Sequence, residues 1–130
     1  MLVRFFTDEA AKIPAIRAML EPQHHVVAQL LGGGGAQIGS NGVLMVDADL
    51  REAARVEQIK LVLRDLNCIP EKLFVVQKHL HHMIAQAFAL GATAVVSRQG
   101  EIIRKLERIE IAEKAAQISP IAPSQSSSRK

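Results

Sequence analysis

The stretch Gly42-Val43-Leu44-Met45-Val46-Asp47 decides the fold, because it is a short apolar run that ends in a carboxylate. A second run, Leu2–Phe6, ends in the same way and is followed by Thr7, Asp8 and Glu9. Short runs rich in Val, Leu and Phe are typical of buried β-strands, whereas helices need more residues. Both runs therefore predict strands that carry acidic side chains to their carboxyl ends.

Along the rest of the chain, short runs of this kind alternate with apolar residues at helical spacing, such as Ile59 and Leu63. The expected strands are Leu2–Phe6, His25–Leu31, Val43–Val46, Leu73–Val76 and Ala94–Ser97, and the expected helices are Asp8–Leu20, Leu50–Leu66, Leu80–Leu90 and Glu101–Gln117. Strands that alternate with helices predict an α/β fold with a parallel sheet. Right-handed crossovers favour a flavodoxin-like sheet of five strands in the order 2-1-3-4-5.

One helix is missing from this alternation. The glycine-rich residues 32–42 stand where a helix should join the second and third strands, and glycine is a poor helix former. We therefore expect the second helix to be missing or reduced, so that the first two strands expose apolar side chains on that face. Exposed apolar patches are usually interaction sites. The chain is thus expected to form a homodimer or to dock a partner through this face or through its long last helix.

Length and composition indicate one globular domain. The 130 residues suit a single core, and we expect a folded domain over residues 1–118 followed by a Ser/Pro-rich linker or tail at 119–130. The net charge of +3 is modest and does not predict a nucleic-acid partner. No apolar run approaches the roughly 20 residues that span a bilayer, so no membrane partner is expected. The single Cys68 is expected to be a buried loop thiol, and the cytoplasm is the expected compartment.

The acidic residues form the main candidate site. The carboxyl ends of parallel strands meet at one edge of a sheet, so Asp8, Glu9 and Asp47 are expected to lie together there. Carboxylate oxygens suit Mg²⁺, and one of the three could accept a phosphoryl group. The alternative is that these aspartates merely cap the helices that follow the strands.

The stretch Ala85-Gln86-Ala87-Phe88-Ala89-Leu90-Gly91-Ala92-Thr93 resembles the entry into the fifth strand of the receiver domains of two-component response regulators. The resemblance extends over about Leu2–Ile109. It implies a CheY-like fold, in which Asp8 and Glu9 correspond to the metal-binding acidic pair. Asp47 then corresponds to the aspartate that a histidine kinase phosphorylates, with Mg²⁺ bound beside it.

Three positions depart from the pattern that the resemblance implies. Gln77 replaces the hydroxyl residue that would contact the phosphoryl group, Val95 replaces the switch aromatic, and Arg98 replaces the lysine. Arginine is not equivalent to lysine at such a site, because its planar fork cannot present a compact ammonium. These changes resemble a degenerate pseudo-receiver, in which Arg98 would serve as a permanent cation in place of Mg²⁺.

The function expected from this resemblance is a non-enzymatic regulatory module that needs no cofactor and acts by contact with an output domain or partner signalling protein. More loosely, the chain resembles the modules found ahead of HD-GYP phosphodiesterase domains, although it contains no HD or GYP motif. The alternative is a working receiver that accepts phosphate on Asp47 with Mg²⁺. A small flavodoxin-like enzyme or nucleotide binder is a third class, which no motif supports.

Overall fold

The computed structural model describes residues 1–33, 41–76, 81–97 and 99–118. By its internal contacts the chain divides into two compact units, Met1–Arg98 and Gln99–Lys130. The strands of the first unit are β1 (Leu2–Thr7), β2 (His25–Leu30), β3 (Val43–Asp47), β4 (Lys72–Val75) and β5 (Ala94–Val96). Its helices are α1 (Lys12–Leu20), α2 (Ala53–Asp65) and α3 (His81–Leu90), and the second unit carries α4 (Gln99–Ile118).

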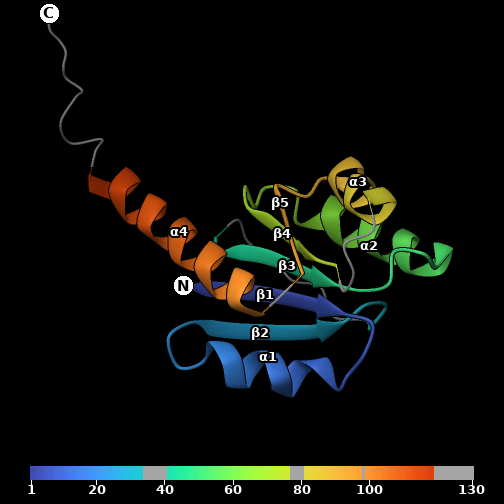
Figure 1. Cartoon of the computed structure of the whole chain (residues 1–130), viewed down its shortest axis with the longest axis horizontal. Coiled ribbons are helices and arrows are strands. Elements are labelled where there is room, and N and C mark those ends of the chain that lie inside the picture. Colours follow the sequence, from blue (N-terminus) through green and yellow to red (C-terminus); the bar gives the residue numbers. More distant parts are fainter. Residues whose placement is uncertain (34–40, 77–80, 98, 119–130) are drawn as a thin grey trace, which may run out of the picture. The chain divides into compact units, whose positions relative to one another are not determined.

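The five strands form one parallel sheet in the order β2-β1-β3-β4-β5, which is the flavodoxin-like arrangement (Figure 1). The predicted fold class and strand order are therefore confirmed. The boundaries agree to within two residues except at the starts of α1 and α2. The helix α1 begins at Lys12, four residues later than expected, because Asp8–Ala11 form a turn that precedes it. The helix α2 likewise begins three residues later than expected, and α4 two residues earlier.

The core of the first unit lies against the face of the sheet that α2 and α3 cover (Figure 1). Side chains alternate between the faces of a strand, so Phe6, Val46 and Phe74 point to the same face. They pack in one buried cluster with Ile59 of α2 and Ala87 of α3. The helix α1 lies on the opposite face, beside β2. The apolar stripes that predicted the helices are thus the residues that bury the sheet.

No helix lies between β2 and β3 in the part of the chain that the structure describes. The glycine-rich residues 34–40 lie outside the described residues. The face on which a second helix was expected to be missing or reduced is less apolar than predicted. Register with Arg4 and Phe6 places three β2 residues on that face: His25, Val27 and Gln29.

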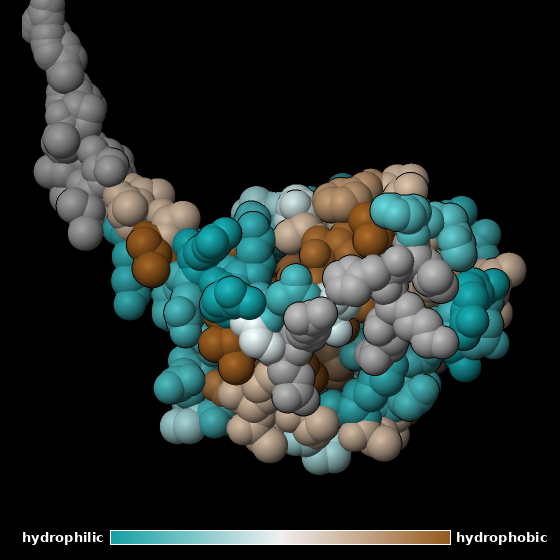
Figure 2. All heavy atoms as spheres, in the orientation of Figure 1, coloured by the Kyte–Doolittle hydropathy of each residue, from teal (hydrophilic) through white to brown (hydrophobic). Residues whose placement is uncertain are grey.

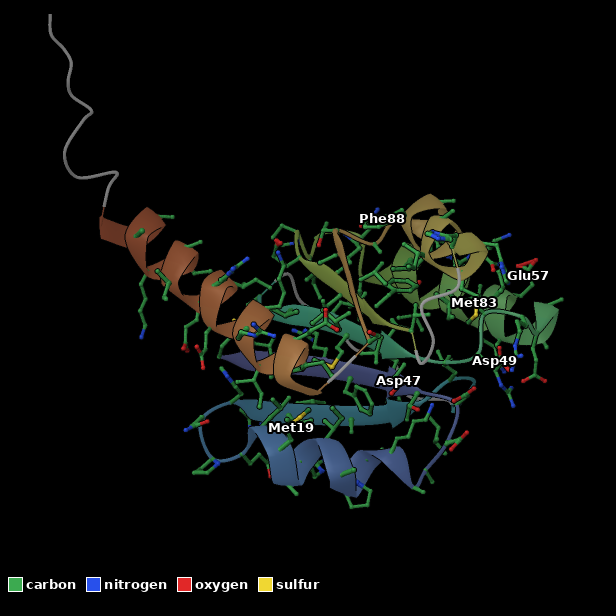
Figure 3. All side chains as sticks on the ribbon, viewed as in Figure 1. Met19, Asp47, Asp49, Glu57, Met83 and Phe88 are labelled. Carbon is green, nitrogen blue, oxygen red and sulfur yellow. The ribbon has the colours of Figure 1, made fainter. Side chains whose placement is uncertain are left out.

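Of these five residues, Arg4 and Phe6 are buried, His25 is exposed, and Val27 and Gln29 are half-buried. The large apolar side chains that are exposed among the described residues are Leu30, Leu61, Phe88 and Ile111, and none of them lies on this face. The expectation of an exposed apolar patch on β1 and β2 is therefore wrong for the described residues. Figure 2 shows apolar surface on the visible side near α3 instead, where Figure 3 labels Phe88.

The start of β3 is fixed by contacts that precede the strand. The guanidinium of Arg4 donates to the carbonyl oxygen of Asn41 at 3.2 Å and to its side-chain Oδ1 at 2.8 Å. Gly42 follows with a φ of 86°, and a Cβ at this position would lie 2.5 Å from the carbonyl oxygen of Leu2. The backbone crosses so close to β1 here that only glycine fits.

None of the described helices combines the length and the apolar character needed to cross a bilayer. The expected boundary between a domain at 1–118 and a tail at 119–130 stays a prediction, because residues 119–130 lie outside the described residues.

Candidate functional site

The acidic residues meet at the carboxyl edge of the sheet, as the parallel topology requires. Asp47 is the last residue of β3 and pairs in register with Thr7, the last residue of β1, so that Asp8 follows immediately beside it. Figure 3 labels Asp47 at the tip of β3 and Asp49 in the loop that leads to α2. The side chains of Asp8 and Asp47 are only 8% and 10% exposed. Two carboxylates that are this deeply buried need a positive partner.

That partner is Lys12, the first residue of α1. Its Nζ donates a hydrogen bond to Oδ1 of Asp47 at 3.0 Å and lies 3.6 Å from Oδ1 of Asp8. The amine reaches both carboxylates because the turn at Asp8–Ala11 brings the start of α1 back over the strand ends. The hydroxyl of Thr7 accepts a hydrogen bond from the Glu9 amide at 3.2 Å and helps to hold this turn.

The electrostatics of Lys12 follow from this position. Burial of the amine lowers its pKa, but the hydrogen bond to Asp47 and the charges of Asp47, Asp8 and Glu9 outweigh that effect. The pKa of Lys12 is therefore raised above its ordinary value, and Lys12 is fully charged at neutral pH. The ammonium is a permanent counter-ion for the two buried carboxylates.

The second oxygen of Asp8 connects the site to the loop between β3 and α2. The backbone amide of Asp49 donates to Oδ2 of Asp8 at 3.0 Å, and Nε of Arg55 in α2 lies 3.9 Å from the same oxygen. By contrast, Oδ1 of Asp8 and Nε of Arg55 are buried and have no hydrogen-bond partner in the structure. Charge attraction therefore holds Asp8 to Lys12 and to Arg55.

The loop itself is tied together by Asp49 and Arg51. Oδ1 of Asp49 accepts hydrogen bonds from the amide and Nε of Arg51, and Oδ2 accepts one from Nη2, each at 3.0 Å. The bonds from the Arg51 side chain and amide lower the pKa of Asp49 to about 2. Asp49 is thus ionised at neutral pH, and its carboxylate accepts hydrogen bonds from Arg51 in the same loop.

These residues do not fit Mg²⁺ as they stand. Within the described residues no three His, Cys, Asp or Glu side chains form a group that could hold a metal ion. Glu9 is exposed, and the charged amine of Lys12 lies against both Asp8 and Asp47, where it would repel a second cation. In this arrangement the ammonium of Lys12 balances the charge of the two carboxylates. The Mg²⁺ site predicted at Asp8, Glu9 and Asp47 stays a prediction.

The structure describes only one of the three degenerate switch positions. Val95 in β5 is half-buried and packs against the core cluster, as an apolar strand residue does. Gln77 and Arg98 lie outside the described residues, so the predicted role of Arg98 as the permanent cation remains a prediction. Cys68 is exposed, which contradicts the expectation of a buried thiol.

The sequence analysis missed Lys12, although a signal for it was present. A lysine four residues after an aspartate is a common ion-pair spacing, and Lys12 follows Asp8 at this distance. The contact with Asp47, 35 residues away in sequence, could not be read from any spacing. It depends on where α1 begins.

No protein-family model, no curated protein and no solved structure matches the chain.

Proposed function

We propose that this chain is a regulatory signal-transduction module of the pseudo-receiver type, which accepts little or no phosphate on Asp47. The observation that carries the proposal is the Lys12 ammonium, 3.0 Å from Asp47 and 3.6 Å from Asp8. A phosphoacceptor aspartate must present a free oxygen, and a cation must neutralise the incoming group. Here the Lys12 ammonium already binds the Asp47 carboxylate, so the charge of the site would stay the same without phosphorylation.

The module would act by contact and not by catalysis. Its proposed partners are an output domain or a partner signalling protein, and a second copy of the chain. The proposed setting is the cytoplasm, with no requirement for a cofactor and no role for nucleic acid or membrane. The proposal is also supported by the sequence, in which the hydroxyl, aromatic and lysine positions of a working receiver are replaced by Gln77, Val95 and Arg98.

The alternative function is a working receiver that uses Asp47 with Mg²⁺. One observation favours it: Oδ1 of Asp8 is buried and has no hydrogen-bond partner, so an oxygen is available to a cation that could displace Lys12. In that case phosphorylation would require Lys12 to leave Asp47. A histidine kinase is not needed to test this, because a small phosphodonor can supply the phosphoryl group directly.

The expected result is that the wild-type chain stays unmodified when it is incubated with acetyl phosphate or beryllium fluoride in the presence of Mg²⁺. Intact-mass measurement and amide NMR shifts around Asp47 would report any product. An Asp47→Asn variant provides the blank, and a working receiver domain treated in parallel shows that the reagents are active. Stoichiometric modification of Asp47 in the wild-type chain would overturn the pseudo-receiver proposal in favour of the alternative.

A further inference from the structure

Asp8 is the point at which three segments of the first unit meet. Lys12 approaches its Oδ1 from α1, the Asp49 amide donates to its Oδ2 from the loop after β3, and Arg55 approaches Oδ2 from α2. The Asp8 side chain is only 8% exposed, so solvent screens these interactions weakly. A change in charge on one of the three segments therefore alters the electrostatic environment of the other two, because all three contact the Asp8 carboxylate.

The contacts of Asp8 are unequal in kind. The bond from the Asp49 amide is a directional hydrogen bond at 3.0 Å, whereas Lys12 and Arg55 lie at 3.6 Å and 3.9 Å from the carboxylate. At these two distances the attraction is Coulombic and falls off slowly. The carboxylate thus lies between two cations, and a hydrogen bond links it to the Asp49 amide.

The loop after β3 is held together by its own hydrogen bonds. Three hydrogen bonds link the carboxylate of Asp49 to Arg51, and the amide of Glu52 donates to the carbonyl oxygen of Asp49 at 3.4 Å. The turn therefore keeps its own shape, and it contacts Asp8 through the hydrogen bond from the Asp49 amide. Arg51 is exposed and would carry the movement to the surface.

We infer that Asp8 is a positioning residue that couples the Lys12–Asp47 ion pair to the loop at residues 48–52 and to the first turn of α2. This inference rests on the proposed function and adds its regulation. A partner that draws Lys12 away from the carboxylates leaves Asp8 beside Asp47 with no ammonium between them, so Asp8 shifts toward Arg55. The Asp49 hydrogen bond is then strained, and the Asp49–Arg51 turn is the surface that reports the state of the site.

The first test is amide hydrogen exchange, followed by NMR on the full chain. In Lys12→Met the exchange of the Asp49 amide should speed up by about tenfold, because its acceptor is displaced. The matched control is Arg17→Met, which removes another cation from α1 but one that pairs with Glu21 at the surface. An Asp49 amide that exchanges equally slowly in Lys12→Met and in the wild type overturns the inference.

The second test is a double-mutant cycle between Lys12→Met and Arg55→Met, read from chemical unfolding. Lys12 and Arg55 are both cations and form no ion pair with each other, so coupling beyond their direct repulsion must pass through the Asp8 carboxylate. We expect measurable coupling in the Asp8 background and its loss in Asp8→Asn. Additive effects of the two variants in the Asp8 background would contradict the inference. Phosphorylation of Asp47 would instead overturn the proposed function and leave this coupling intact, so the two failures are distinguishable.

Discussion

Replacing Gly42 by alanine is expected to lower the free energy of unfolding by about 3 kcal/mol. Two effects add at this position. The φ of 86° is a left-handed conformation that alanine adopts with strain, and the new Cβ would lie 2.5 Å from the carbonyl oxygen of Leu2. Because that atom belongs to the backbone of β1, it cannot rotate away. Thermal unfolding should shift down by about 10 °C for a domain of this size.

Gly91→Ala is the matched control for Gly42→Ala. Gly91 also has a positive φ, at 121°, but nothing lies within 4 Å of the Cβ that alanine would add there. This variant should show the backbone strain alone, which is about 1–2 kcal/mol. If the two variants lose the same stability, the close approach of β1 to Gly42 does not constrain the fold.

Most of the fold could be predicted from local sequence, and the reason is visible at the strands. Val43, Leu44, Met45 and Val46 are all buried, as both faces of a central parallel strand are, so a continuous apolar run identified β3. The order of the strands followed from handedness and from the alternation with helices. Neither inference needed any long-range contact.

The surface of the sheet was harder to predict than its order. The expectation of an apolar face on β1 and β2 treated both strands as apolar throughout, but side chains alternate between faces. Register decides which of them share a face, and it pairs Arg4 with Val27 and Phe6 with Gln29. Two of these four side chains are polar. Where a helix was expected to be missing, the described strands therefore carry polar side chains, which composition alone did not indicate.

The site could be predicted in part. The positions of Asp8 and Asp47 followed from the strand ends, whereas the identity of their cation did not. The expected helix started at Asp8, which would have placed Lys12 in its second turn, away from the strand tips. The helix in fact starts at Lys12, and the turn before it places the amine of Lys12 beside the carboxylates. An error of four residues at a helix boundary thus hid the partner of both aspartates.

Removing this partner is expected to have the largest effect at the site. Lys12→Met should lower the free energy of unfolding by about 2 kcal/mol at pH 7, because breaking a buried ion pair costs several kcal/mol and Lys12 is partly open to solvent. The pKa of Lys12 is raised, so its contribution is complete below the unfolded value of 10.5. It is lost only as the pH rises through the folded value. The loss at pH 7 therefore measures the whole contribution of the charge.

The same variant should gain a response to Mg²⁺ that the wild-type chain lacks. Without the ammonium, Asp8 and Asp47 keep two buried carboxylates at one point, and Mg²⁺ binds in proteins through one or two carboxylates and several waters. At a Mg²⁺ concentration 100 times the dissociation constant, binding would restore about 2.7 kcal/mol. The measurement is chemical unfolding in MgCl₂ against NaCl of equal ionic strength.

Arg17→Met and the double variant Lys12→Met/Asp47→Asn are the controls for this response. Arg17 pairs with Glu21 at the surface and donates a hydrogen bond to the carbonyl oxygen of Val26 at 3.0 Å, so its loss should cost about 1 kcal/mol and should leave the chain insensitive to Mg²⁺. The double variant removes a metal ligand and should lose the gained response. If Lys12→Met is as stable as the wild type, or stays insensitive to Mg²⁺, the ammonium of Lys12 does not stand in for a metal ion. If Arg17→Met gains the same response, Mg²⁺ acts on the general charge of α1 and not on the pair of Asp8 and Asp47.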